Sequence, residues 1–192
     1  IMNKTKIKIQ DTTLRDGEQT PGVAFNLNDK LRVFNILKHI GVDCIEVGFP
    51  AASLQEENII RKLCAKVSNS NITICVFARA LEKDILIAKE VTKNLKNAKI
   101  QIVSPVSDLQ IKYSVNASKD QIVMQLKESI LLAKKFFKEI QFTAQDATRA
   151  KSTFLKKLLS VAVEYGASSL CLPDTTGFST PTEYSRLIKV VK

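Results

Sequence analysis

Six short runs of apolar and β-branched residues recur along the chain at the spacing of one strand–helix unit. They cover residues 6–12, 44–49, 72–78, 99–103, 139–143 and 168–172. Each run is nearly continuous in apolar residues, as is typical of a strand in a parallel sheet whose outer face is covered. The pattern therefore predicts six strands, each followed by a helix.

Helical periodicity fills the segments between these runs. A first helix is indicated by an apolar face that ends before Gly41 and consists of Leu27, Leu31, Phe34, Leu37 and Ile40. A third helix is predicted over residues 81–95 and a fifth over 154–162. Capping boxes predict the starts of the second, fourth and sixth helices, in the pairs Ser53 with Glu56, Ser118 with Gln121 and Thr180 with Glu183.

Polar side chains follow almost every predicted strand, as Asp16 does the first, Asp146 the fifth and Asp174 the sixth. A TIM barrel builds its site from such positions, at the carboxyl ends of its strands. A doubly wound sheet would bind at one switch point, and the chain has no GxGxxG or Walker loop to support it. We therefore predict an α/β fold, an incomplete (β/α)₈ TIM barrel of about six βα units, with residues 1–192 forming the first part of its catalytic domain.

Composition narrows the class of function. The chain has 192 residues, 45% of them hydrophobic, and a net charge of +10. Its lysines are scattered over the predicted helices without a basic block interleaved with aromatic residues, so we expect no nucleic-acid partner. No apolar run reaches the roughly 18 residues of a membrane span, and residues 1–8 lack the apolar core of a signal peptide. We expect a cytoplasmic protein without a membrane partner.

Buried thiols and one buried carboxylate are also expected. The cysteines Cys44, Cys64, Cys75 and Cys171 are widely spaced and form no CxxC pair, which favours reduced thiols in the core over disulfides or a zinc site. Glu46 lies within the otherwise apolar run CIEVGF. Because an unpaired buried charge is costly, this carboxylate needs a partner.

Four motifs carry a resemblance to a known family. Residues 11–19 read DTTLRDGEQ, followed in order by IEVGFP at 45–50, QDATR at 145–149 and LPDTTG at 172–177. In these stretches the chain resembles the metal-dependent barrels that include isopropylmalate, homocitrate and citramalate synthases and hydroxymethylglutaryl-CoA lyase. The resemblance covers the whole chain. Residues 11–26 and 104–113 look most like nitrogenase-associated homocitrate synthases, specifically the amino-terminal (omega) subunit of those that have two chains.

The resemblance implies a Claisen-type condensation of acetyl-CoA with 2-oxoglutarate to homocitrate and CoA, in the service of the nitrogenase iron–molybdenum cofactor. A base removes a methyl proton from acetyl-CoA, the enolate attacks the ketone, and the thioester is then hydrolysed. A divalent metal, Mg²⁺ or Mn²⁺, acts as Lewis acid and template. A cationic donor stabilises the developing oxyanion.

The motifs also imply roles for single residues. Asp16 matches the metal-ligand aspartate of the family, with a salt bridge to its neighbour as the alternative, and Arg15 matches the catalytic arginine. Gln19 helps to orient these groups. Glu46 is either an active-site acid or a partner of Arg15, and a purely structural ion pair remains open. Thr175 matches a threonine that binds the keto-acid carboxylate, and substrate contacts are further expected at two residues, Arg79 and Ser104.

Two departures from the family pattern limit what the resemblance implies. Gln145 stands where many relatives have a glutamate, and an amide cannot exchange a proton. The His-x-His metal pair of the family lies on a seventh strand, which this chain does not reach. We therefore expect a second subunit to supply the last strands and the remaining metal ligands, unless the chain is a fragment. Isopropylmalate or citramalate synthase, and a non-catalytic barrel subunit, remain alternatives.

Overall fold

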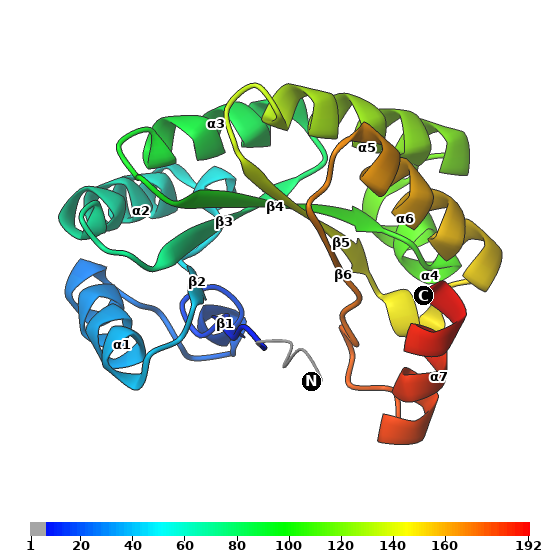
Figure 1. Cartoon of the computed structure of the whole chain (residues 1–192), viewed down its shortest axis with the longest axis horizontal. Coiled ribbons are helices and arrows are strands. Elements are labelled where there is room, and N and C mark those ends of the chain that lie inside the picture. Colours follow the sequence, from blue (N-terminus) through cyan, green and yellow to red (C-terminus); the bar gives the residue numbers. More distant parts are fainter. Residues whose placement is uncertain (1–6) are drawn as a thin grey trace, which may run out of the picture. The chain divides into compact units, whose positions relative to one another are not determined.

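The computed structural model describes residues 7–192 and contains six strands in one sheet, which follow one another in chain order (Figure 1). The pairings β1–β2, β2–β3 and β5–β6 are parallel. The strands are β1 (Gln10–Asp11), β2 (Cys44–Glu46), β3 (Thr73–Arg79), β4 (Ala98–Pro105), β5 (Glu139–Gln145) and β6 (Ser169–Cys171). A doubly wound sheet would reverse this order at its switch point. The fold is therefore six βα units of an incomplete (β/α)₈ barrel, as predicted.

Each strand is followed by a long helix. These helices are α1 (Leu27–Ile40), α2 (Leu54–Val67), α3 (Glu82–Thr92), α5 (Lys119–Ala133), α6 (Ser152–Tyr165) and α7 (Pro181–Val191). Short helical turns lie between strand and helix at η1 (Gly17–Gln19), η2 (Pro50–Ala52), α4 (Asp108–Gln110), the π-helical η3 (Ile111–Val115) and η4 (Ala147–Arg149). Within residues 7–192, no helix combines the length and the apolar character that crossing a membrane requires.

The chain divides into two compact units. The first unit comprises Ile1–Phe77 and Leu86–Lys99, and the second comprises Ala78–Ile85 and Ile100–Lys192. In the first unit α1 and α2 pack side by side (Figure 1). The apolar side chains of this unit that solvent does not reach include Ile45, Ile60 and Leu63.

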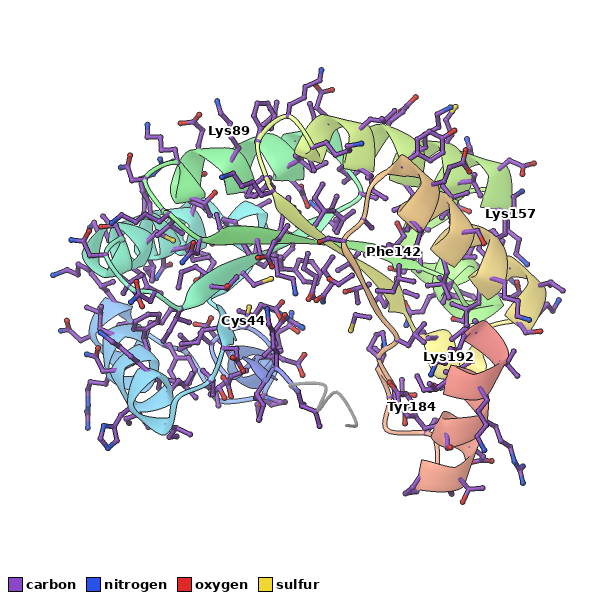
Figure 2. All side chains as sticks on the ribbon, in the orientation of Figure 1. Cys44, Lys89, Phe142, Lys157, Tyr184 and Lys192 are labelled. Atoms are coloured by element: carbon purple, nitrogen blue, oxygen red, sulfur yellow. The ribbon has the colours of Figure 1, made fainter. Side chains whose placement is uncertain are left out.

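In the second unit α5 packs against α6, and α6 against α7. Phe142 of β5 is fully buried and lies among the side chains between the strand and its helices (Figure 2). Lys157 points outward from α6, where it meets Asp120 of α5 at 3.4 Å (Figure 2). The unit therefore has an apolar interior and a charged exterior of its own.

The buried face of α1 differs from the predicted one. Its fully or nearly buried residues are Lys30, Phe34 and Leu37, whereas Ile40 is 68% exposed. The spacing of the buried residues is still helical. The face is rotated because the Lys30 ammonium finds carboxylate partners inside the unit. Periodicity of apolar residues alone could not show this.

Two of the three predicted capping boxes form, at Ser118 with Gln121 and at Thr180 with Glu183. The third is half formed. The Ser53 hydroxyl accepts a bond from the backbone N–H of Glu56, but the Glu56 carboxylate pairs with Lys30. The buried cation thus takes the carboxylate that the capping box would have used.

The first, second and last strands are shorter than predicted, and the second ends at Glu46 instead of residue 49. The predicted first strand covers residues 6–12, of which residue 6 lies outside the described residues, and regular pairing is confined to Gln10–Asp11. Pairing begins irregularly there, because the Asp43 side chain accepts from the backbone N–H of Ile9. In β6, Leu170 is 42% exposed and Cys171 is half-buried, while the other cysteines are buried as expected. None of the four cysteines forms a disulfide bond.

Candidate active site

The loop after β1 and the end of β2 bring four of the predicted site residues together. The Arg15 Nε donates to Glu46 Oε1 at 2.6 Å, and Nη2 lies 3.4 Å from Glu46 Oε2. The Arg15 Nη1 donates to Asp16 Oδ1 at 2.7 Å and to Gln19 Oε1 at 3.3 Å. We refer to Arg15, Asp16, Gln19 and Glu46 as the Arg15 cluster. All four belong to the first unit.

Backbone bonds fold the motif so that these side chains converge. The N–H groups of Arg15 and Asp16 both donate to the carbonyl of Thr12, at 3.0 and 2.7 Å. Gln19 N–H then donates to the Asp16 carbonyl within η1. Leu14 is fully buried and anchors the turn in the core. The apolar residue of the motif is thus held inside, while its charged neighbours stand at the end of the strand.

Glu46 is fully buried, and its environment pulls its pKa in two directions. Burial raises the pKa of the carboxyl above its ordinary value, and the charge of Arg15 and its hydrogen bond oppose that rise. The net pKa is raised, so the paired arginine only partly offsets desolvation. The guanidinium also lies 5.2 Å from the ring centre of Phe77, whose face favours a cation. These contacts hold one edge of the Arg15 guanidinium in place.

A second polar group forms at the carboxyl ends of β4, β5 and β6 within the second unit. The Asp146 carboxylate accepts from the Ser107 hydroxyl and receives Arg149 Nε and Nη2 at 2.7 and 2.8 Å. The Asp146 N–H donates to Thr175 Oγ1 at 2.9 Å. We refer to Ser107, Asp146, Arg149 and Thr175 as the Asp146 cluster. Asp146 itself is fully buried in a left-handed conformation, with φ of 67°.

The two remaining predicted site residues, Arg79 and Ser104, also lie in the second unit. Arg79 forms a bidentate pair with Asp84, with Nε and Nη2 at 2.8 and 3.1 Å from its oxygens. Its side chain is 55% exposed. Ser104 is buried near the end of β4. The substrate roles predicted for both residues stay predictions, as do those of the Arg15 cluster and Thr175.

Sequence reasoning missed a buried cation that lies beside the Arg15 cluster. The Lys30 side chain is fully buried, and its Nζ donates to Glu18 Oε2 at 2.7 Å and to Glu56 Oε1 at 2.6 Å. We refer to these three residues as the Lys30 triad. The available signal was the helical spacing of Lys30 with Phe34 and Leu37, read together with acidic residues near both adjacent strand ends.

The described residues offer only part of a metal site. Asp16 presents a 65% exposed carboxylate, a hard oxygen ligand of the kind that Mg²⁺ and Mn²⁺ take. Among residues 7–192, however, no three His, Cys, Asp or Glu side chains gather in a way that could hold an ion. A single carboxylate fits one coordination position and leaves the others to groups outside this cluster.

The sequence model of the HMGL-like family matches residues 6–192 of this chain. The chain belongs to the HMGL-like family. Its motif at residues 11–19, which forms the turn of the Arg15 cluster, lies within the matched region.

Curated relatives agree with this assignment, and a solved structure agrees with the fold. The chain is 40% identical over 187 residues to the 2-isopropylmalate synthase of Campylobacter hominis, covering 97% of this chain and 37% of that protein. It is 37% identical over 191 residues to 2-isopropylmalate synthase 1 of Caldanaerobacter subterraneus, covering 100% of this chain and 48% of the relative. The chain thus spans less than half the length of these relatives. The fold resembles the structure of the HMG-CoA lyase from Bacillus subtilis, with a TM-score of 0.81 and 17% identity over 97% of this chain and 64% of that one.

Proposed function

We propose that this chain supplies the arginine-bearing part of the active site of an enzyme that condenses acetyl-CoA with a 2-oxo acid. The observation that carries the proposal is the Arg15 cluster. In it a buried carboxylate, Glu46, orients one edge of the Arg15 guanidinium, and the other edge lies against Asp16 and Gln19. A cation oriented in this way suits an oxygen on which negative charge develops.

The chain's own residues have distinct parts in this chemistry. In the condensation a base takes a proton from the methyl group of acetyl-CoA, and the resulting enolate carbon forms a bond to the ketone carbon. The ketone oxygen becomes an oxyanion, which is then protonated to a hydroxyl group. Arg15 stabilises that oxygen, and Glu46 holds Arg15 in place. Asp16 takes one position on a divalent metal, which when bound supplies Lewis-acid polarisation of the keto acid. Hydrolysis of the thioester then releases CoA as a free thiol.

The names of two curated relatives bear on the choice of 2-oxo acid. Those quoted above are both called 2-isopropylmalate synthase. This name favours 2-oxoisovalerate, whose carbon skeleton joined to an acetyl group is that of isopropylmalate. The homocitrate synthase activity predicted from residues 11–26 and 104–113, with 2-oxoglutarate as substrate and a role in nitrogen fixation, has less support. We therefore place isopropylmalate synthesis first and homocitrate synthesis second.

The relatives also bear on the predicted second subunit. Each carries its matched region within one longer chain, of which this chain covers 37% and 48%. They give no support to a separate partner subunit with the last strands and the His-x-His pair. The remaining metal ligands in our proposal come from the seventh and eighth βα units, on whichever polypeptide carries them.

A substrate panel tests the proposal. Thiol release from acetyl-CoA is measured with the chain alone and with a polypeptide that supplies the remaining βα units, in the presence of Mg²⁺ or Mn²⁺. Release with 2-oxoisovalerate, but not with 2-oxoglutarate or pyruvate, is the expected result. Release with 2-oxoglutarate alone would restore the homocitrate synthase assignment. No release with any keto acid would leave the non-catalytic alternative.

A further inference from the structure

The Lys30 triad ties three separate segments of the first unit to one ammonium. Lys30 comes from α1, Glu18 from the loop after β1 and Glu56 from the first turn of α2. The carbonyl oxygens of Leu14 and Val47 also face Nζ, at 3.5 and 3.4 Å. Leu14 precedes Arg15 and Val47 follows Glu46, so each member of the Arg15–Glu46 pair is next in sequence to a residue whose carbonyl faces Lys30.

The loop after β1 has little regular structure of its own, so its shape depends on such contacts. Between β1 and α1 only η1, three residues long, is regular. Glu18 closes the rest of the loop, because Oε2 binds Lys30 and Oε1 accepts from the backbone N–H of Phe25 at 3.1 Å. Arg15 and Asp16 therefore lie between two points, Leu14 and Glu18, that both face the Lys30 ammonium.

The other side of the triad is shaped to admit Glu56. Gly48 has φ of 147°, and a Cβ at this position would lie 2.4 Å from Glu56 Oε1 and 2.7 Å from Ile60 Cδ1. A side chain at residue 48 would thus displace the carboxylate that binds Lys30. Because Gly48 of the IEVGFP motif has no Cβ, the Glu56 carboxylate has space to reach the Lys30 ammonium.

We propose that Lys30 is a positioning residue for Arg15 and Asp16. Its ammonium holds the loop after β1 against the end of β2 and the start of α2, and so determines where the guanidinium and the Asp16 carboxylate stand. This inference rests on the proposed function for the role of Arg15, but the positioning itself is a property of the first unit. A charge buried between two carboxylates suits such a role, since the pairing is lost when any member moves.

Two variants and one control test this inference in the enzyme that contains the whole barrel. Lys30→Met removes the ammonium. Glu56→Gln keeps Lys30 paired with Glu18 but weakens the tie to α2, and it guards against a failure of Lys30→Met to fold. Lys38→Met removes an exposed lysine from the same helix and is the matched control.

Hydrogen exchange of residues 14–25 is the first readout, because it requires no activity. We expect about tenfold or faster exchange in this segment in both variants, with β5 unchanged and with Lys38→Met like wild type. Unchanged exchange of residues 14–25 in Lys30→Met or, if that variant does not fold, in Glu56→Gln would overturn the inference.

Turnover is the second readout. We expect kcat to fall on the order of 10- to 100-fold in each folded variant, with KM for acetyl-CoA little changed, since misplacement of Arg15 affects the transition state most. A wild-type kcat in an active enzyme would overturn the inference and leave the proposed function intact. A wild-type enzyme without condensing activity would refute the proposed function, and hydrogen exchange would still decide whether Lys30 positions the loop.

Discussion

Glu46 Oε1 and Arg15 Nε lie 2.6 Å apart, across 31 positions of sequence, and this contact joins the end of β2 to the loop after β1. The carboxylate side chain is fully buried, whereas the arginine side chain is 16% exposed. A carboxylate inside an apolar strand thus balances and orients a cation that still reaches the surface. The contact explains why the strand tolerates a charge that would be costly without a partner.

The pH dependence of stability reports on Glu46. Burial raises its pKa above the ordinary 4.5, so between pH 4.5 and the raised value the folded protein holds a proton that the unfolded chain has lost. The stability from this group is complete below pH 4.5 and falls as the pH rises through the folded pKa. We expect wild type to lose stability relative to Glu46→Gln as the pH rises from 4.5 towards neutrality, measured by urea unfolding.

The comparison with Glu46→Gln isolates this group, since Glu56 shifts in the same direction and is present in both proteins. A stability difference between wild type and Glu46→Gln that stays constant, or that grows in favour of wild type with rising pH, would contradict this prediction.

The apolar core of the second unit is tested at Leu126, which is fully buried on α5. We expect Leu126→Ala to lower the free energy of unfolding by about 2–5 kcal/mol, because the removed methyl groups leave a cavity. Leu131 lies on the same helix and is 42% exposed, so Leu131→Ala should change the free energy of unfolding by less than about 0.5 kcal/mol. Equal losses in the two variants, by chemical denaturation, would show that Leu126 is not in the core.

The Asp146 cluster is tested by a substitution that removes the carboxylate charge and keeps the size of the side chain, which should lower the free energy of unfolding. Asparagine tolerates the left-handed conformation of residue 146, so Asp146→Asn tests the bonds to Ser107 and Arg149 and not the backbone. We expect a loss of about 1–3 kcal/mol in the free energy of unfolding. The exposed Glu139, on the strand β5 that precedes Asp146, provides the control Glu139→Gln, which should stay within about 0.5 kcal/mol of wild type. If the two variants were equally stable, the buried network would contribute nothing.

The strands and most helix starts could be predicted because each rests on a local pattern. Apolar runs mark the strands, and capping residues mark helix starts, as Ser118 and Thr180 do. The need of Glu46 for a partner also followed from its place in an apolar strand. The motif itself brought Arg15 into consideration, but only the folded chain shows which side of the guanidinium each partner occupies.

Lys30 could not be predicted in the same way, because its burial depends on two carboxylates from distant segments. Apolar periodicity treats a lysine as a surface residue, so the predicted face of α1 was turned away from it. Glu56 had a local explanation as a capping residue, which concealed its long-range partner. The contacts of Asp146 could not be predicted for the same reason, since its left-handed conformation is stabilised by residues from three strand ends.

The most direct test of the central claim is the turnover of Arg15→Ala in the assembled enzyme, followed as thiol release from acetyl-CoA with the 2-oxo acid that wild type uses. Arg61→Ala, which removes the partner of Glu57 on the exposed side of α2, is the control. We expect kcat to fall on the order of 10²- to 10³-fold in Arg15→Ala, with a much smaller change in KM and none of this loss in Arg61→Ala. Turnover of Arg15→Ala close to that of wild type would show that Arg15 does not act at the reacting centre.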